Sequence, residues 1–196
     1  PTRRSSDLIP RYYDVTKGSV KVDGVDVRDM TQKELRDKLG YVPQKGVLFS
    51  GTIDSNIRYG KPEITDAQVK EAAEVAQATE FIDTKPEKYE SPVSQGGTNV
   101  SGGQKQRLSI ARAIAKYPEI FIFDDSFSAL DFKTDSQLRK ALKEYTKDAT
   151  TVIVAQRIST ILGADQIIVL DDGHMAGIGT HKELMANCEV YQQIAR

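Results

Sequence analysis

Two kinds of hydrophobic run along the chain predict a mixed α/β fold. Four consecutive apolar residues, Ile120–Phe123, are typical of a parallel strand covered on both faces. A polar segment that we interpret as a helix, roughly Lys133–Tyr145, separates this strand from a second buried run, Thr151–Ala155. Strand, helix and strand in this order predict a right-handed crossover within a parallel sheet.

The first third of the chain predicts an antiparallel part. Alternating apolar positions over Ser19–Val27 are interrupted by an Asp-Gly pair, which favours a β-hairpin. Thr31 and Glu34 have the spacing of a capping box, so we expect a short helix at Gln32–Lys38. The apolar residues of Leu39–Val42 then predict a strand, which a proline ends.

Helix-starting residues recur further along the chain. A capping box at Thr65 predicts an amphipathic helix, and a longer helical pattern runs from Ser101 to Tyr117. The C-terminal part predicts a strand at Gln166–Leu170, a turn, a return strand, and two short helices that begin near Thr180 and Glu189.

Composition excludes several classes of protein. The 196 residues carry 27 basic and 28 acidic side chains, so there is no broad positive charge for nucleic acid or anionic lipid. No apolar stretch approaches the roughly 20 residues that cross a bilayer. We therefore expect a soluble chain, and the single cysteine, Cys188, favours a reducing compartment. His174 and His181 lack the spacing of metal ligands.

Two segments carry residues suited to phosphate chemistry. Asp124 and Asp125 follow a buried strand, and a carboxylate at the end of a parallel strand can hold Mg²⁺; the alternative is that Asp124 only caps the next turn. The other segment places glycines at a helix start, where backbone N–H groups bind anions, although such a pair also occurs in simple turns. Its residues are Ser101, Gly102, Gly103 and Gln104.

These motifs, taken in order, resemble the nucleotide-binding domain of an ABC transporter. The sequence VSGGQKQR spans Val100–Arg107, and IFIFDD is followed by SALD at Ser128–Asp131. The segments Tyr41–Gln44 and Leu48–Ile53 are most similar to the exporter branch. The resemblance implies a P-loop NTPase-like parallel sheet core, an antiparallel β part and a helical subdomain at about residues 50–116.

The resemblance also implies roles for single residues. Gln44 matches the glutamine that contacts Mg²⁺ or the attacking water, and Asp124 matches the aspartate that holds Mg²⁺ through water. The stretch Ser101–Gln104 matches the motif that binds the γ-phosphate of ATP held by a second such domain. Asp131 matches an aspartate that reaches across the interface between the two domains.

Two positions depart from the family pattern. Asp125 stands where the family has a catalytic glutamate, and Gln156 stands where it has a histidine that contacts the γ-phosphate. A carboxylate misplaced by about 1 Å lowers rates by on the order of 100-fold, and an amide cannot become a cation. We expect weak hydrolysis at the site formed by Gln44, Asp125 and Gln156, as in one half of a heterodimeric exporter.

The phosphate-binding G-x-x-x-x-G-K-S/T motif of the family does not occur in the 196 residues. Leu8–Asp14 resembles the segment that follows this motif, and its lysine would fall near Thr2. We expect residues 1–7 to be foreign sequence and residues 8–196 to be a partial ATP-binding domain truncated at the N-terminus. The alternative is a natural variant that has lost ATP binding.

By resemblance, the ligands are ATP and Mg²⁺, and the partners are a second ATP-binding domain and a transmembrane domain absent from this chain, at the cytoplasmic face of the plasma membrane. Two alternatives are a soluble ABC ATPase, against which the compact spacing from Gln44 to Ser101 argues, and an inactive or regulatory fragment. The segment Ser50–Ala78 is expected to contact transmembrane helices, with Phe49 and Tyr59 as anchors. The basic run at 105–107 is interpreted as a solvated helix face, and a contact with a partner is the alternative.

Overall fold

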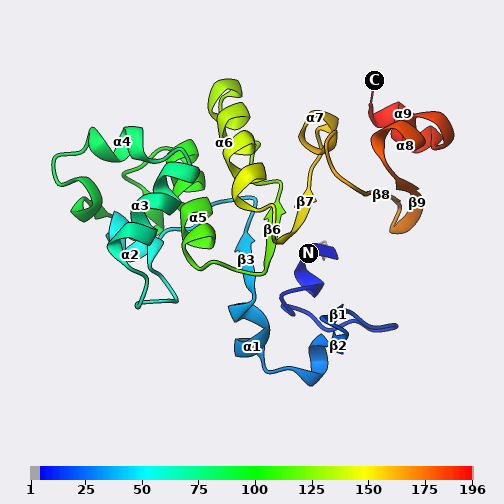
Figure 1. Ribbon diagram of the computed structural model, residues 1–196, viewed down its shortest axis with the longest axis horizontal. Coiled ribbons are helices and arrows are strands. Elements are labelled where there is room, and N and C mark those ends of the chain that lie inside the picture. Colours follow the sequence, from blue (N-terminus) through cyan, green and yellow to red (C-terminus); the bar gives the residue numbers. More distant parts are fainter. Residues whose placement is uncertain (1–4, 196) are drawn as a thin grey trace. The chain divides into compact units, whose positions relative to one another are not determined.

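A three-stranded parallel sheet forms the centre of the first of two compact units in the chain (Figure 1). The computed structural model describes residues 5–195, and the first unit ends at Val154. The strands β3 (Leu39–Val42), β6 (Ile120–Asp124) and β7 (Thr150–Val154) lie in the order β3–β6–β7, and all run in the same direction. Their carboxyl ends therefore share one edge of the sheet, where ligands of open α/β sheets bind.

The central strand β6 is covered on both faces. Phe121 and Phe123 point into the larger apolar cluster of the unit, while Ile122 between them belongs to a second cluster that contains Leu35 and Leu39. This alternation follows from the two-residue period of a strand. Burial on both faces explains why β6 consists almost entirely of apolar residues.

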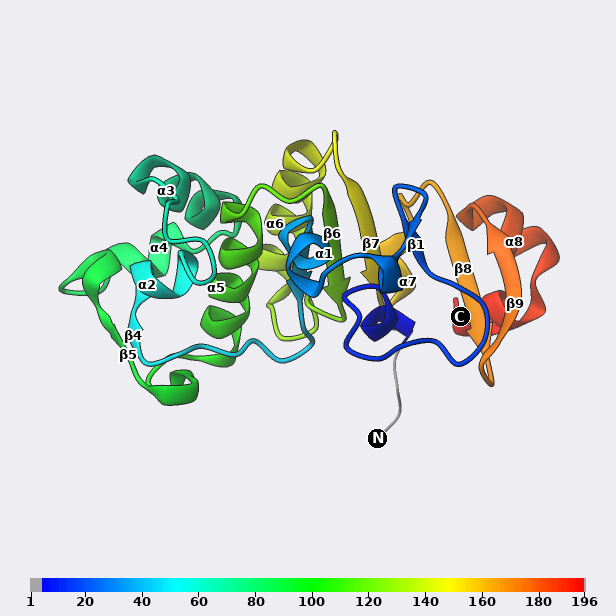
Figure 2. The same ribbon diagram turned by 90° about the horizontal axis from the view of Figure 1, so that it is seen from below.

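The helix α5 (Gly102–Ala115) lies between the sheet and the helices α2 and α3 (Figure 2). It packs against α2, α3 and β3, and it begins at a capping box in which Ser101 accepts from the N–H of Gln104. The helical elements of this unit are α1 (Gln32–Asp37), α2 (Ile53–Ile57), α3 (Asp66–Val75), α4 (Thr79–Asp83), α5 (Gly102–Ala115) and α6 (Phe132–Tyr145), with short strands β4 (Gly51–Thr52) and β5 (Pro92–Val93) and 3-10 turns η3 (Lys88–Glu90) and η4 (Gln95–Gly97).

The predicted hairpin is present as β1 (Lys21–Val22) and β2 (Val25–Asp26). Its turn residues Asp23 and Gly24 both have positive φ, of 52° and 80°, which is the backbone that an Asp-Gly turn supplies. A 3-10 turn, η2 (Val27–Asp29), follows directly.

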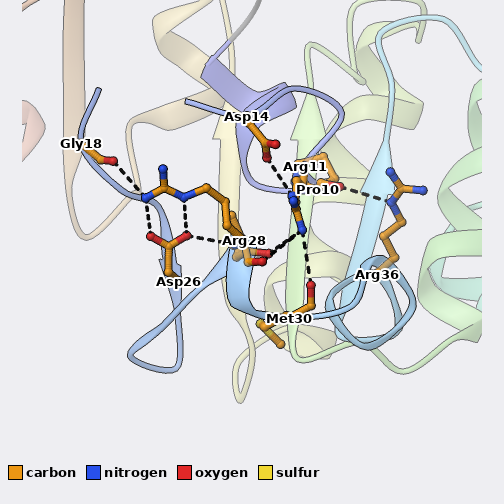
Figure 3. A network of polar contacts seen from close by, with 9 residues as sticks. Pro10, Arg11, Asp14, Gly18, Asp26, Arg28, Met30 and Arg36 are labelled. Atoms are coloured by element: carbon orange, nitrogen blue, oxygen red, sulfur yellow. Dashed lines mark hydrogen bonds and ion pairs between the residues drawn. The ribbon is translucent and has the colours of Figure 1, made fainter. Parts of the chain in front are cut away.

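Arginine side chains attach the segment before this hairpin to the elements that follow it (Figure 3). The Arg11 guanidinium donates to the main-chain oxygens of Val27, Arg28 and Met30 at 3.3–3.5 Å. Arg36 of α1 donates to the Pro10 carbonyl at 3.2 Å. One guanidinium thus contacts three carbonyl groups of the segment that follows the hairpin.

The second unit starts at Ala155 and has its own small core. Its elements are α7 (Ile158–Ile161), β8 (Ile167–Asp171), β9 (His174–Gly179), α8 (His181–Asn187) and α9 (Glu189–Ile194). Strands β8 and β9 form an antiparallel hairpin, and Leu184 of α8, Tyr191 of α9 and Cys188 between these helices form a buried cluster with β8. The Cys188 thiol is buried beside Gly177, where an added Cβ would lie 2.8 Å from the sulfur.

Element boundaries differ from the predicted ones by one or two residues. The strand predicted at Thr151–Ala155 runs from Thr150 to Val154, and the helix expected to reach Tyr117 ends at Ala115. Tyr117 has a left-handed φ of 51°, which no α-helix continues through. The short helices α2 and α4 were not predicted.

The N-terminal residues include a segment that was predicted to be foreign. Of residues 1–7, the first four lie outside the described residues. The 3-10 turn η1 (Ser5–Leu8) follows, and Ser6 within it is buried. Among the helices that the structure describes, none has the length and apolar character needed to cross a membrane.

Candidate functional site

Two residues predicted to act in catalysis meet at the carboxyl ends of β3 and β6. Gln44 lies two residues beyond β3 and Asp125 lies one residue beyond β6, and the two strands are parallel neighbours. The Gln44 amide Nε2 donates to Asp125 Oδ2 at 2.9 Å. The parallel pairing of the strands thus brings together two side chains that are 81 positions apart in sequence.

The backbone around Asp125 is fixed by hydrogen bonds from three directions. Asp125 itself has a left-handed φ of 48°, and its N–H donates to the Val154 carbonyl at 2.8 Å. The hydroxyl of the fully buried Ser126 donates to the Val42 carbonyl at 2.8 Å, and the Ser128 hydroxyl donates to the Asp125 carbonyl at 3.0 Å. Aspartate tolerates this φ better than most residues, and these bonds hold it there.

Asp124 is the buried carboxylate of the site. It is 2% exposed at the end of β6, and the Tyr41 hydroxyl lies 3.4 Å from its Oδ2 and 3.4 Å from Asp7 Oδ1. Burial and the charge of Asp124 together raise the pKa of Tyr41 well above its usual value, so Tyr41 stays protonated and can donate.

This donor set fits a magnesium ion that keeps most of its ligands as water and phosphate oxygens. Mg²⁺ in such sites takes one or two protein carboxylates, and Asp124 supplies one at the sheet edge beside the Gln44 and Asp125 pair. Among residues 5–195, no group of three or more His, Cys, Asp or Glu side chains forms a complete metal cage.

The predicted anion-binding segment forms the N-terminus of α5. Ser101 accepts from the Gln104 N–H at 3.2 Å, and the Gln104 carboxamide accepts from the Ser101 N–H at 3.1 Å. Gly102 is exposed and its missing side chain would meet no atom within 4 Å, while Gly103 lies beside the Ala129 carbonyl. A capped, open glycine helix start of this kind is suited to an anion.

Asp131 serves as a helix cap in this structure. Its carboxylate accepts from the Thr134 N–H at 2.9 Å and from the Thr134 hydroxyl at 2.7 Å, at the start of α6. The same hydrogen bonds lower the pKa of Asp131 below its usual value. Gln156 is exposed and belongs to the second unit.

An aromatic pair lies beside Arg112 of α5. The rings of Phe49 and Tyr59 stack with centroids 4.1 Å apart and planes 18° apart. The Arg112 guanidinium lies 5.2 Å and 5.5 Å from the two ring centroids, and Tyr59 is 52% exposed. We call Phe49, Tyr59 and Arg112 the aromatic platform.

The family model of the ABC transporter matches residues 6–128, which is more than half of the chain. The chain belongs to the ABC transporter family. An uncharacterised ABC transporter ATP-binding protein of Mycobacterium tuberculosis is 48% identical over 191 residues, which cover 96% of this chain and 32% of the relative. The chain thus spans about a third of the length of the curated relatives it matches.

Two further ABC proteins carry more specific descriptions. A putative multidrug export ATP-binding/permease protein of Staphylococcus aureus is 46% identical over 188 residues, which cover 96% of this chain and 32% of that protein. The structure of a bacterial Atm1-family ABC exporter with ATP bound matches with a TM-score of 0.93 and 39% identity, over 96% of this chain and 33% of that one. The mixed α/β fold with a parallel core is therefore that of an ABC ATP-binding domain.

Several residues around the ABC site escaped the sequence analysis. Tyr41 of β3 lies near Asp124, and Ser126 in the turn after β6 bonds to the Val42 carbonyl. The two-residue period of β3, which places Tyr41 on a half-buried face, was the signal from which Tyr41 could have been found. The interpretation of residues 105–107 as a solvated face is wrong for two of them. Gln106 is 1% exposed, and the Arg107 guanidinium lies 4.8 Å from the Phe81 ring centroid. The segment after β3 covers Gln106, and Phe81 of α4 covers Arg107.

Proposed function

We propose that this chain is the ATP-binding domain of an ABC exporter, which couples ATP binding and hydrolysis to a transmembrane domain at the cytoplasmic face of the plasma membrane. The contact of Gln44 with Asp125, beside the buried Asp124, carries this proposal because it gathers the polar groups for phosphate chemistry at one sheet edge. The printed descriptions of the Staphylococcus aureus relative and of the Atm1-family exporter support the direction of transport.

Within this proposal, Asp124 would hold Mg²⁺ through water, and the bound ion would supply positive charge that neutralises the phosphates. Gln44 orients the attacking water through its carboxamide, while Asp125 Oδ2 accepts the proton of that water. The hydrogen bond between Gln44 and Asp125 supports these paired roles, because it sets the two polar groups side by side before any nucleotide binds.

The N-terminus of α5 acts on a different ATP molecule. We propose that Ser101 and the following residues bind the γ-phosphate of ATP held by a second ATP-binding domain, with Asp131 next to the shared interface. The open approach to Gly102 supports contact with an external anion. We further propose that the second domain belongs to a chain of different sequence, so that the pair is a heterodimer.

Two substitutions make this chain the weaker half of such a pair. The Asp125 carboxylate is one methylene shorter than the glutamate of the family, which withdraws it by about 1 Å and lowers the rate by on the order of 100-fold. Gln156 can donate a hydrogen bond to a phosphate but cannot supply a positive charge. The partner's site, completed by Ser101–Gln104 of this chain, then performs most of the hydrolysis.

The aromatic platform is the proposed contact for the transmembrane domain. Tyr59 exposes half of its surface while its ring stacks on Phe49, so the pair presents a rigid apolar surface to a partner.

A chimaera tests the proposed function. Residues 8–196 replace the corresponding segment of the Staphylococcus aureus multidrug export relative, which supplies the preceding part of the ATP-binding domain and the permease. We expect slow ATP hydrolysis in this protein, and an increase on the order of 10- to 100-fold in kcat for Asp125→Glu. Asp125→Asn is the matched control, because it has the same size but accepts no proton.

Two results would contradict the proposal. Fast hydrolysis that Asp125→Glu does not raise would show that Asp125 already suffices, and the weak-half assignment would be wrong. Nucleotide binding without hydrolysis, both in the chimaera and in its Asp125→Glu variant, would favour the regulatory alternative. The presence of Asp125 and Gln156 is also consistent with that alternative.

A further inference from the structure

One buried side chain of α5 hydrogen-bonds both ends of the segment that carries Gln44. The Gln106 carboxamide is 1% exposed, and its Nε2 donates to the Pro43 carbonyl at 3.1 Å. Its Oε1 accepts from the Gly46 N–H at 3.0 Å. Pro43–Gly46 therefore forms an arc, with Gln44 and Lys45 between two fixed ends.

The arc is also pressed against α5 by the absence of a side chain at Gly46. A Cβ at this position would lie 2.7 Å from the Ser109 hydroxyl oxygen and 2.9 Å from the Lys105 carbonyl oxygen. A backbone carbonyl of a helix cannot move aside cheaply, so only glycine permits this approach. The short distance from Gly46 to α5 is what lets a glutamine side chain span the arc.

We propose that Gln106 is a positioning residue that holds the arc so that the Gln44 amide meets the Asp125 carboxylate. Gln106 belongs to α5, and the N-terminus of α5 is the anion-binding segment. Through Gln106, the position of α5 therefore determines the position of Gln44. This inference rests on the proposed function only in giving Gln44 and Asp125 a chemical role, because the positioning itself involves no nucleotide.

The chemistry of the glutamine side chain explains why this residue type is needed. The two ends of the arc require one donor and one acceptor from a single side chain, and a primary amide has both. Glutamate keeps the acceptor for Gly46 but has no donor for Pro43. Methionine has a similar length and neither hydrogen bond, and it tolerates burial.

Nuclear magnetic resonance of the ¹⁵N-labelled 196-residue chain tests the proposal in the absence of nucleotide. The measurements are the hydrogen-exchange rate of the Gly46 amide and the resonances of the Gln44 side-chain amide, in wild type, Gln106→Glu and Gln106→Met. Gln77→Glu is the matched control, because among the described residues the Gln77 carboxamide donates to the nearby Glu74 carbonyl, at 3.1 Å, and to no part of the arc.

We expect Gly46 exchange to rise on the order of 5- to 10-fold in Gln106→Met, as the loss of one hydrogen bond implies. The Gln44 amide resonances should shift in both Gln106 variants, since the contact with Asp125 loosens, and Gln77→Glu should leave both observables unchanged. Amides within α5, such as that of Ile110, should keep their exchange rates.

Wild-type values at Gly46 and Gln44 in the folded variants would overturn the proposal. An equal rise at Gly46 and at Ile110 would also overturn it, because Gln106 would then only stabilise the fold. If one variant does not fold, the other decides by the same criteria. In the chimaera, Gln106→Met should lower kcat with KM unchanged. A chimaera inactive in every variant would count against the proposed function and leave the resonance results intact.

Discussion

Arg112 provides a test of whether the contacts of a partly buried cation outweigh its lost hydration. Its guanidinium donates to the Val47 carbonyl at 3.0 Å and to the carbonyl and side-chain oxygens of Asn56 at 2.8 Å and 2.9 Å. It also faces the rings of Phe49 and Tyr59. Within the part of the chain that the structure describes, it forms no ion pair. Burial lowers its pKa to about 10, so it remains charged at neutral pH.

The magnitude follows from what each partner of Arg112 keeps when the guanidinium is removed. The two Asn56 oxygens retain donors, the Arg58 N–H for the carbonyl and the Phe49 N–H for the side chain. The Val47 carbonyl loses its side-chain donor, at a cost of about 1 kcal/mol because it lies near the surface. Loss of the cation from the two rings costs about 1 kcal/mol more. We therefore expect Arg112→Met to lower the free energy of unfolding by about 2 kcal/mol.

Urea unfolding followed by circular dichroism and tyrosine fluorescence measures this change. With a slope of about 2 kcal/mol per M, the midpoint of the transition of the first unit should fall by about 1 M. Arg28→Met is the matched control, because Arg28 forms a solvent-exposed pair with Asp26 at 2.8 Å, and exposed pairs of this kind contribute little to stability. An unchanged or higher midpoint for Arg112→Met would refute the reasoning, since it would show that desolvation of the cation outweighs its contacts.

Two further predictions concern the core and the pH dependence. Gly40→Ala places a Cβ 2.7 Å from a Pro118 ring carbon, so we expect overpacking to cost about 1–3 kcal/mol and lower the Tm; an unchanged Tm would contradict the tight fit. Hydrogen bonds from Arg28 lower the pKa of Asp26 from 3.8 to about 2. The stability that Asp26 contributes is therefore complete above about pH 4 and is lost as the pH falls through about 2. Arg28→Met should return the Asp26 pKa part of the way toward 3.8 in a carbon-13 titration, because the backbone N–H of residue 28 still donates to Asp26, and a midpoint that stays near 2 would exclude the Arg28 side chain as the cause.

Local signals account for the parts of the fold that the sequence analysis predicted well. The predicted capping boxes at Thr31 and Thr65 are present, and the helices begin at the next residue in both cases. A capping box joins residues three apart, so the chain nearby specifies it without help from distant segments. The strand predicted at Leu39–Val42 has those bounds, because its apolar run ends at a proline.

The site contains contacts that no local signal could reveal. Gln106 lies in a run of polar and charged residues, so its pattern is typical of a solvated face, yet the arc after β3 covers it. Gln44 and Asp125 follow the carboxyl ends of two strands, which predicts that they lie at the same edge of the sheet. This pattern does not predict that their side chains are in contact. That contact depends on the left-handed backbone of Asp125 and on the path of the arc, and both are set by tertiary packing.

The packing of Cys188 makes the second unit accessible to chemical labelling experiments. Cys188 is the single cysteine of the chain, and its thiol fills the space that the missing side chain of Gly177 leaves. A bulky thiol reagent can reach the sulfur only when this packing opens. The rate at which the chain acquires one label therefore reports the opening equilibrium of residues 155–196, without any signal from the sheet and helices that precede them.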